Sequence, residues 1–407
     1  MNTKTKSSIF SSPSGESYLF PFILVTSLFL MWGLAHGLLD VLNKHFQVTF
    51  TMSKAQSGLV QFSTYIAYGL FSIPAGLFMK KFGYKKGIIL GLLLFAIGAF
   101  GFVPATFFHS FNPFLFALFV VACGLCVLET AANPYSTVLG PKDSAAQRIN
   151  LSQSFNGLGW VLGPFIGGQL ILSATYDDTM ATAKPYLILG ICTLIIAILF
   201  FFTKLPDIVE ADENLVVDGD RTVAKSMWTY KHFILAIIAQ FLYCAAQTGI
   251  FSFFINYVTE LDHTINAVKA SKLLAFGGMA LFMIGRLSGS FIMGLFRPNK
   301  LLAFYSLMCS AAMILVILQM GKLSLYALYT SFFFMSIMFP TIFALGISKM
   351  GINTKKASSY IIMSVAGGAF APMLMGHIGE KSMAIGFIIP LVCFLYILFY
   401  GLKGYRM

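Results

Sequence analysis

The chain has 407 residues, of which 58% are hydrophobic and 10% are charged. Soluble globular proteins carry about 25% charged residues, so the composition excludes a soluble enzyme and predicts a chain that lies almost wholly in a lipid bilayer. The formal net charge of +12 is typical of a membrane protein whose cytoplasmic loops collect Lys and Arg, and it does not indicate a nucleic-acid partner.

Twelve apolar runs predict twelve membrane-spanning helices, because one crossing takes about 20 apolar residues. The first six runs lie near residues 20–42, 57–79, 87–106, 113–138, 149–172 and 185–202, and the second six near 233–258, 273–296, 301–320, 323–347, 358–377 and 384–402. The intervening stretch is acidic and has no long apolar run. The expected organisation is a cytoplasmic N-terminal tail (1–19), a six-helix half (20–203), a cytoplasmic linker (204–231), a second six-helix half (232–402) and a cytoplasmic C-terminal tail (403–407).

The basic residues predict the orientation in the membrane. With both termini in the cytoplasm, nineteen Lys and Arg residues fall on the inner side and seven on the outer side, and Arg286 stays within span eight. Positive charge marks the cytoplasmic side of a membrane protein. The turns after spans two and eight also match, since each follows a glycine, Gly76 or Gly289, and ends in basic residues. Such repeated halves are typical of secondary transporters, although the topology rule alone also makes short inner loops basic.

Two acidic residues lie inside predicted spans, Asp40 in span one and Glu129 in span four. A charge at the bilayer centre costs about 2.5–3.5 kcal/mol on insertion scales, so each carboxyl group needs a protein partner, water or a proton. A carboxyl group kept from water can exchange a proton near working pH, which is what a proton-coupling site requires. The alternative is a structural pairing with a buried donor such as Arg286 or His36.

Trp32, His36 and Asp40 follow one another at intervals of four residues. This spacing predicts one face of a helix, which presents an indole, an imidazole and a carboxyl group to the same site. Gly33 and Gly37 form a G-x-x-x-G pair beside that face. Such a pair favours the close approach of another helix backbone.

Further polar residues of spans four, five and seven predict a site for a ligand rich in hydroxyl groups. The candidates are Asn133, Gln153, Asn156, Gln240, Tyr243 and Gln247. Amides and phenols donate and accept hydrogen bonds, and aromatic rings cover the apolar faces of a sugar. The same amides also join helices in lipid, so a binding role and a packing role both stay open.

The sequence lacks a nucleophile motif, an ATP-cradling glycine loop and a group of His and Cys at metal-ligand spacing. It therefore predicts a protein that is not an enzyme and that binds neither metal nor cofactor. The expected coupling ion is H⁺, and Na⁺ stays open because carboxylates and amides serve either ion. A proton-coupled exporter of a drug or metabolite on the same fold is the alternative function, and a membrane-embedded enzyme or a sensor without flux is a more distant one.

Two segments carry a resemblance to a known family, Leu128-Glu-Thr-Ala-Ala-Asn-Pro134 and Leu151-Ser-Gln-Ser-Phe-Asn156. Together with the face from Trp32 to Asp40, they resemble the fucose/galactose/glucose proton symporter family of the major facilitator superfamily. Further matches are Gly285-Arg-Leu-Ser-Gly289, Phe296-Arg-Pro-Asn-Lys300 and Ser336-Ile-Met-Phe-Pro-Thr-Ile-Phe343.

The resemblance implies an all-α integral membrane protein with twelve transmembrane helices in two pseudo-symmetric halves. It implies import of a monosaccharide by symport with a cation, through alternating access, by a multi-pass monomer of the bacterial cytoplasmic (inner) membrane. In that family Asp40 and Glu129 match the acids of proton coupling and the sugar site, and Trp32, Gln153 and Asn156 match residues that line the site. His36, Asn133, Gln240, Tyr243, Gln247 and Phe339 complete the expected substrate-binding set.

The chain departs from the family pattern at three places. Gly37 stands where fucose-type members have an asparagine, Met338-Phe339 replaces a Gln-Tyr pair in span ten, and Lys80 replaces the usual aspartate after span two. The first two changes remove polar groups that could hold sugar hydroxyls. A hexose such as glucose, galactose or mannose, or an N-acetylated hexose, is therefore at least as good a candidate as fucose.

Overall fold

The computed structural model describes residues 10, 17–108, 110–141, 145–173, 180–203, 227–348, 350 and 354–407. Within these ranges it has twelve helices long and apolar enough to cross a membrane, which confirms the expected all-α, twelve-span class. Most of the predicted tail 1–19 and residues 204–226 of the predicted linker lie outside the described residues.

The first six spans are built from eight helices. These are α1 (Leu19–Thr49), α2 (Lys54–Ser57), α3 (Leu59–Phe82), α4 (Tyr84–Phe100), α5 (Phe102–Phe107), α6 (Phe111–Val138), α7 (Ala145–Gly167) with the π-helical turn η2 (Gly168–Leu172), and α8 (Ala183–Phe202). Within this half, α1 packs on α7, α4 packs on α6 and α8, and α3 packs on α6.

The second six spans begin after the short turn η3 (Met227–Thr229). They comprise α9 (Lys231–Leu261), α10 (Ala267–Leu273), the π-helical η4 (Leu274–Met279), α11 (Ala280–Leu295), α12 (Pro298–Ile317), α13 (Lys322–Met335), α14 (Met338–Ile347), α15 (Thr354–Met363), the 3-10 turn η6 (Ser364–Ala366), α16 (Gly367–Ile378), α17 (Met383–Gly386), α18 (Ile388–Leu402) and η7 (Gly404–Arg406). In this half, α12 packs on α13 and α18, and α9 packs on α16 and α18.

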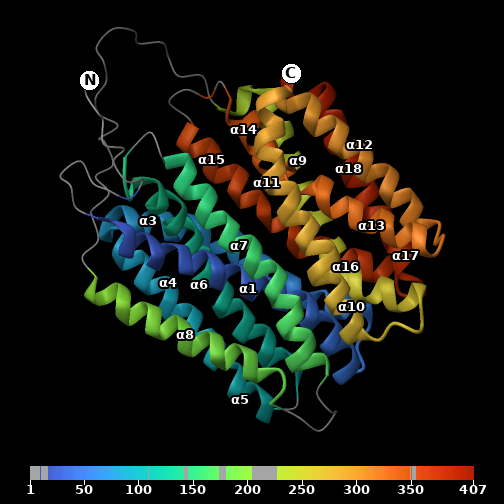
Figure 1. Cartoon of the computed structure of the whole chain (residues 1–407), viewed down its shortest axis with the longest axis horizontal. Coiled ribbons are helices and arrows are strands. Elements are labelled where there is room, and N and C mark those ends of the chain that lie inside the picture. Colours follow the sequence, from blue (N-terminus) through green and yellow to red (C-terminus); the bar gives the residue numbers. More distant parts are fainter. Residues whose placement is uncertain are drawn as a thin grey trace, which may run out of the picture.

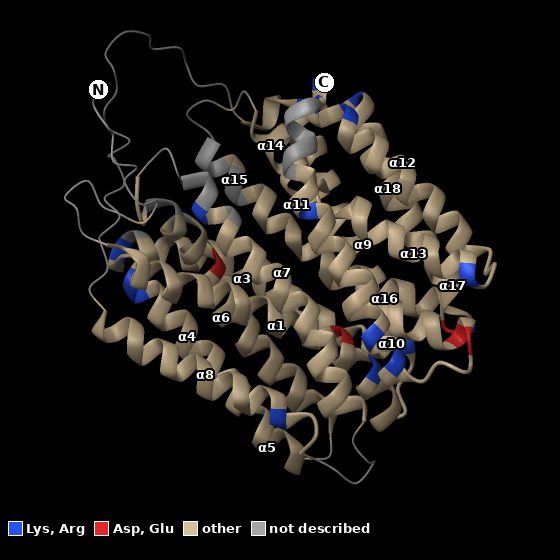
Figure 2. Ribbon diagram, in the orientation of Figure 1, with Lys and Arg blue, Asp and Glu red and all other residues tan. Residues whose placement is uncertain are grey.

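The two halves lie side by side, with α1 to α8 in blue to green and α9 to α18 in yellow to red (Figure 1). Contacts between them run along α1 and α9, along α3 and α16, and between α7 and η4. Lys and Arg gather mainly near helix ends, while the long middle stretches carry little charge (Figure 2). This distribution is the one a bilayer imposes, because charge in its hydrocarbon core is costly.

Helices α1 and α7 approach each other through glycines on both sides. A β-carbon at Gly33 would come within 3.0 Å of the Cα of Gly159, and a β-carbon at Gly163 would come within 2.6 Å of the Cα of Gly37. Real side chains do not fit at such separations. The close backbone approach that the G-x-x-x-G pair predicts is therefore confirmed, with α7 as the partner.

Two spans differ from their predicted form. Helix α1 continues to Thr49 rather than ending near 42, because Asn43, Phe46 and Gln47 are buried against other helices. The polar residues of this stretch suggest instead that it faces water. Span ten is broken between α13 and α14, where Pro340 has no N–H to donate to the carbonyl four residues earlier. The longer α1 places Asp40 nine residues before its end, deeper than the sequence suggests.

Candidate functional site

Asp40 lies between the two halves of the molecule. Its side chain is 2% exposed, and its Oδ1 accepts hydrogen bonds from Gln61 Nε2 at 3.2 Å and from Ser252 Oγ at 3.5 Å. Gln61 belongs to α3 of the first half and Ser252 to α9 of the second. The other oxygen, Oδ2, is buried and has no hydrogen-bond partner among the residues that the structure describes. Among the described residues no Lys or Arg forms an ion pair with Asp40, so its charge has no permanent counterion.

His36, one turn before Asp40, is surrounded by aromatic rings. Its ring centroid lies 5.3 Å from that of Trp160, 6.0 Å from Tyr68, and 6.1 Å from both Tyr65 and Trp32. Its Nδ1 is 3.1 Å from the carbonyl oxygen of Trp32. The predicted face of α1 therefore forms, with Trp32 and His36 in contact, and rings from α3 and α7 complete it. Such a cluster offers apolar ring faces next to hydrogen-bonding edges, which suits a sugar ring.

Glu129 lies on α6, deep among protein atoms yet partly exposed. Tyr68 is a side-chain neighbour and Arg286 on α11 is the nearby positive charge. Among the described residues Glu129 has no ion pair, and the Arg286 guanidinium instead stacks on the Phe282 ring at 4.8 Å. Among the described residues, neither an ion pair of Glu129 with Arg286 nor one of Asp40 with His36 is formed.

Three amides of spans four and five have two different roles. Gln153 Nε2 donates to Asn133 Oδ1 at 3.2 Å, and Asn133 Nδ2 donates to the backbone carbonyl of Glu129 at 3.1 Å. Gln153 and Asn133 are both partly exposed, so they keep bonding capacity for a ligand. Asn156 is buried, and its Nδ2 donates to the carbonyl of Phe29 at 3.2 Å, which joins α7 to α1.

The candidate residues of α9 also differ in whether their side chains are buried or partly exposed. Gln247 is partly exposed. Tyr243 is buried and its hydroxyl donates to the carbonyl of Met335, at the break between α13 and α14, at 3.0 Å. Partly exposed Phe339 lies against the Tyr243 ring, with centroids 6.2 Å apart. Gln240 is fully buried, and both polar atoms of its amide lack hydrogen-bond partners within the described ranges.

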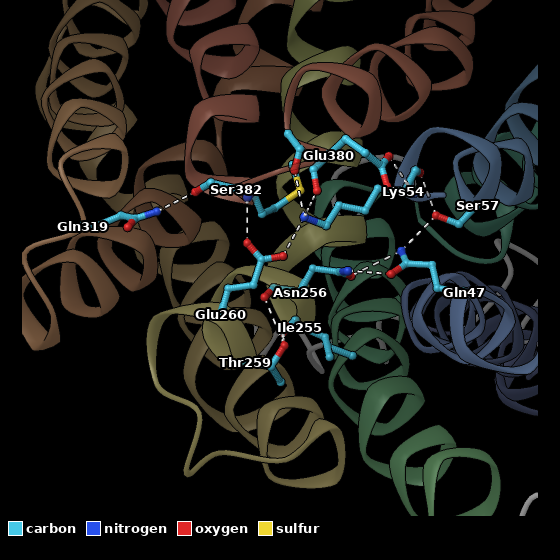
Figure 3. Close-up of polar contacts among 12 residues, drawn as sticks. Gln47, Lys54, Ser57, Ile255, Asn256, Thr259, Glu260, Gln319, Glu380 and Ser382 are labelled. Carbon is cyan, nitrogen blue, oxygen red and sulfur yellow. Dashed lines mark hydrogen bonds and ion pairs between the residues drawn. The ribbon is translucent and has the colours of Figure 1, made fainter. Parts of the chain in front are cut away.

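A second group of polar contacts joins the halves beyond Asp40 (Figure 3). Lys54 Nζ lies 2.6 Å from Glu260 Oε1 and donates to the carbonyls of Gly379 and Glu380 at 2.8 and 3.0 Å. The backbone N–H of Lys54, at the start of α2, donates in turn to the Glu380 carboxylate at 3.1 Å. Lys54 of the first half thus caps the end of α16 in the second half, and Glu380 of the second half caps the start of α2 in the first.

Several residues of the site were not among the sequence candidates. Gln61, Tyr65 and Tyr68 lie at i, i+4 and i+7 on one face of α3, and this spacing is a signal in the sequence that could have marked them as neighbours. Trp160 and Ser252 carry no comparable signal. They join the site because α7 packs on α1 and α9 faces α1, which are tertiary facts.

Two six-helix halves, with partly exposed polar and aromatic side chains and two acids that form no ion pair within the described part of the chain, define a membrane transport protein of the two-half class. A family model of the Major Facilitator Superfamily matches residues 21–372. The L-fucose-proton symporter of Escherichia coli (strain K12) is 37% identical over 402 residues, covering 93% of this chain and 92% of that protein. The glucose/galactose transporter of Brucella abortus biovar 1 (strain 9-941) is 36% identical over 401 residues, covering 96% of this chain and 95% of that protein.

Among solved structures, that of the E. coli fucose:proton symporter has a TM-score of 0.70 and 36% identity, covering 95% of this chain and 98% of that one. The chain belongs to the Major Facilitator Superfamily. The resemblance noted in the sequence to its fucose and glucose/galactose transporters is confirmed along nearly the whole chain.

Proposed function

We propose that this protein is a secondary active transporter that imports a monosaccharide by symport with a cation, most simply H⁺, through alternating access. The observation that carries the proposal is the placement of Asp40 and Glu129 inside the bundle, where no other described residue forms an ion pair with either acid. An acid held there can take up and release a proton as its surroundings change. The relatives named above, a sugar-proton symporter and a sugar transporter, favour this function over an exporter of drugs or metabolites.

Different partly exposed side chains make different kinds of contact with the sugar. Asn133, Gln153 and Gln247 supply donors and acceptors for sugar hydroxyls, and Trp32 and Trp160 supply ring faces. Asp40 and Glu129 contact the sugar and respond to its presence by changing protonation. A carboxylate that binds hydroxyls is stabilised in its charged form, so sugar occupancy and proton binding become linked.

The substrate class is a hexose, a deoxyhexose or an N-acetylhexosamine. Gly37 and Met338-Phe339 reduce the number of polar groups available to the sugar, which favours a sugar with an apolar face toward span ten. Partly exposed Phe339 offers that apolar contact. The identities to fucose and to glucose/galactose transporters are nearly equal, at 37% and 36%, so they do not choose between these sugars.

We place both termini in the cytoplasm and the protein in a bacterial inner membrane, as a monomer without cofactor. The excess of Lys and Arg on the terminal side supports this orientation. The contacts of Lys54 with Glu260 and Glu380 then lie on the outer side, and the structure is closed toward the outside of the cell. Na⁺ in place of H⁺ is the alternative coupling ion.

The test is counterflow of labelled monosaccharides in proteoliposomes, with pH and Na⁺ varied independently. Counterflow of at least one hexose or deoxyhexose is expected, and none with any sugar would refute sugar transport. Glu129→Gln is then expected to keep sugar exchange but to lose uphill uptake, because a glutamine cannot carry the proton. Uphill uptake that persists at the wild-type level in this variant would exclude Glu129 from coupling. The direction of transport in inverted vesicles separates import from export.

A further inference from the structure

The two ring nitrogens of His36 have different surroundings. Nδ1 lies 3.1 Å from the carbonyl oxygen of Trp32, one turn earlier on α1. Nε2 makes no hydrogen bond with any residue that the structure describes. The side chain is 5% exposed, and Nε2 does not belong to the fully buried polar atoms that lack a partner. This nitrogen therefore keeps accessible surface and is free to bind a ligand.

The contact with Trp32 determines which nitrogen carries the proton. A carbonyl oxygen can only accept a hydrogen bond, so Nδ1 donates to it. In a neutral imidazole the other nitrogen is then an acceptor. A charged imidazolium would need a counterion in this buried setting, and no Asp or Glu among the described residues forms an ion pair with His36. The ring therefore presents Nε2 as an acceptor.

Aromatic rings of three helices hold the imidazole in place. The ring centroid of His36 lies 5.3 Å from Trp160 on α7, 6.0 Å from Tyr68 on α3, and 6.1 Å from Tyr65 on α3 and Trp32 on α1. An imidazole enclosed in this way has little freedom to rotate, so the direction of Nε2 is fixed. Trp32, Tyr65 and Trp160 are partly exposed as well, so the accessible surface of Nε2 adjoins theirs.

This ring cluster lies inside the molecule and next to the second half. The ring of Trp160 contacts that of Phe251 on α9, with centroids 5.6 Å apart. Asp40 follows His36 by one turn of α1 and contacts Ser252 of α9. A ligand held between the halves therefore reaches Nε2 of His36 from the same side as the acid.

A packing role alone does not account for an imidazole at this position. Phenylalanine would fill the space among the four rings without bringing in a polar atom. A nearly buried nitrogen without a hydrogen-bond partner is costly, and here the cost falls on Nε2 only, since Nδ1 is satisfied. A hydroxyl group of a bound sugar would supply the missing donor.

We propose that Nε2 of His36 accepts a hydrogen bond from one hydroxyl group of the transported sugar, and that this contact selects substrates with a donor at that position. The inference rests on the proposed function and deepens it. The amides of Asn133, Gln153 and Gln247 both donate and accept, so they tolerate either kind of group, whereas Nε2 only accepts. Hydrogen, fluorine or an ether oxygen at that position leaves Nε2 unpaired, while a hydroxyl group or the N–H of an N-acetyl group satisfies it.

The experiment measures how singly modified sugars inhibit counterflow in proteoliposomes. The labelled sugar is D-glucose, D-galactose or L-fucose, whichever gives counterflow, and the competitors are its monodeoxy and deoxyfluoro derivatives, one pair for each hydroxyl group. Fluorine is close to a hydroxyl group in size but cannot donate a hydrogen bond. At the hydroxyl group that binds His36, both derivatives are expected to inhibit about tenfold less well than the parent sugar, because Nε2 loses its donor.

His36→Phe identifies which hydroxyl group this is. The variant keeps an aromatic ring in the cluster and removes the acceptor. At one position of the sugar, the two derivatives are then expected to inhibit within about twofold of the parent, because no contact is left to lose. The carboxyl groups of Asp40 and Glu129 also accept hydrogen bonds, so other positions show the wild-type pattern in the variant as well.

Two further substitutions separate the two nitrogens of the ring. Glutamine has the length to place its amide oxygen near the position of Nε2, so His36→Gln is expected to restore discrimination at that position of the sugar. Asparagine is one methylene shorter and reaches only the position of Nδ1, so His36→Asn is expected to behave like His36→Phe. His263→Phe is the matched control, because it removes an exposed imidazole outside the ring cluster.

Three results would overturn the inference. His36→Phe could keep the wild-type pattern at every hydroxyl group, or it could weaken inhibition by the parent and all derivatives equally, which is the sign of a packing role. Alternatively, the fluoro derivative at the His36-dependent position could inhibit the wild type as well as the parent does, which would make Nε2 a donor. If His36→Phe does not fold, the comparison of His36→Gln with His36→Asn decides.

Failure of this inference differs from failure of the proposed function. Counterflow with at least one of the three sugars, but without a His36-dependent position, refutes the role of His36 and leaves sugar transport standing. Absence of counterflow with all three sugars and with the other monosaccharides of the panel refutes sugar transport, and the role of His36 with it.

Discussion

Replacement of Lys54 by methionine is expected to weaken closure of the halves at the end that Figure 3 shows. The ammonium group lies 2.6 Å from the Glu260 carboxylate and donates to two carbonyls beyond the end of α16, at 2.8 and 3.0 Å. Methionine keeps the apolar stem of lysine but removes all three contacts. The contacts between Glu380 and the start of α2 remain, since they involve the Lys54 backbone.

The size of the effect follows from the exposure of the groups. The Lys54 and Glu260 side chains are 13% and 34% exposed, so solvent screens the ion pair and its share is about 1 kcal/mol or less. Hydrogen bonds from a charged donor add about 1.5 kcal/mol in such a partly buried setting. A total near 2 kcal/mol would lower the ratio of closed to open molecules about 30-fold.

The assay is the distance between spin labels at positions 48 and 381, and a double-mutant cycle of Lys54→Met with Glu260→Ala isolates the ion pair from the carbonyl contacts. Lys269→Met is the matched control, because Lys269 is an exposed lysine near the same end and its loss changes the net charge equally. A Lys54→Met distance distribution that coincides with that of the wild type would refute this account of closure.

Two further substitutions test the interior of the bundle by thermal unfolding in detergent. Gly163→Val is expected to lower the apparent melting temperature by about 5 °C or more, because its β-carbon would lie 2.6 Å from a backbone atom of α1 that cannot rotate away. Gly76→Val is the control, since nothing lies within 4 Å of a β-carbon at Gly76. Equal losses of melting temperature in the two variants would contradict the contact between α1 and α7. Gln240→Leu is expected to raise the melting temperature by about 2–4 °C, since it removes two buried polar atoms that have no hydrogen-bond partner among the described residues. A lower melting temperature in Gln240→Leu would show that the amide is satisfied after all.

The spans and the two buried acids are properties that the sequence reveals without coordinates. Apolar runs long enough to cross a bilayer are local features, and Asp40 and Glu129 are conspicuous because charge inside such runs is costly. The spacing of Trp32, His36 and Asp40 also predicts a shared face, since helical periodicity is local, and the rings of Trp32 and His36 do lie in contact. The G-x-x-x-G pair predicted a close helix partner, although not which helix.

Long-range packing decided the rest. The extension of α1 to Thr49 depends on burial of Asn43, Phe46 and Gln47 against other helices, and polarity alone suggests an end near 42. Nothing in the sequence distinguishes Ser252 from other serines in apolar runs. It lies beside Asp40 only because α9 packs on α1. The amides show the same limit: Gln153 and Asn156 lie one turn apart, yet one stays partly exposed while the other joins α7 to α1. Which side chains face each other across the two halves is set by how the helices pack, because burial and hydrogen-bond partners exist only once distant segments meet.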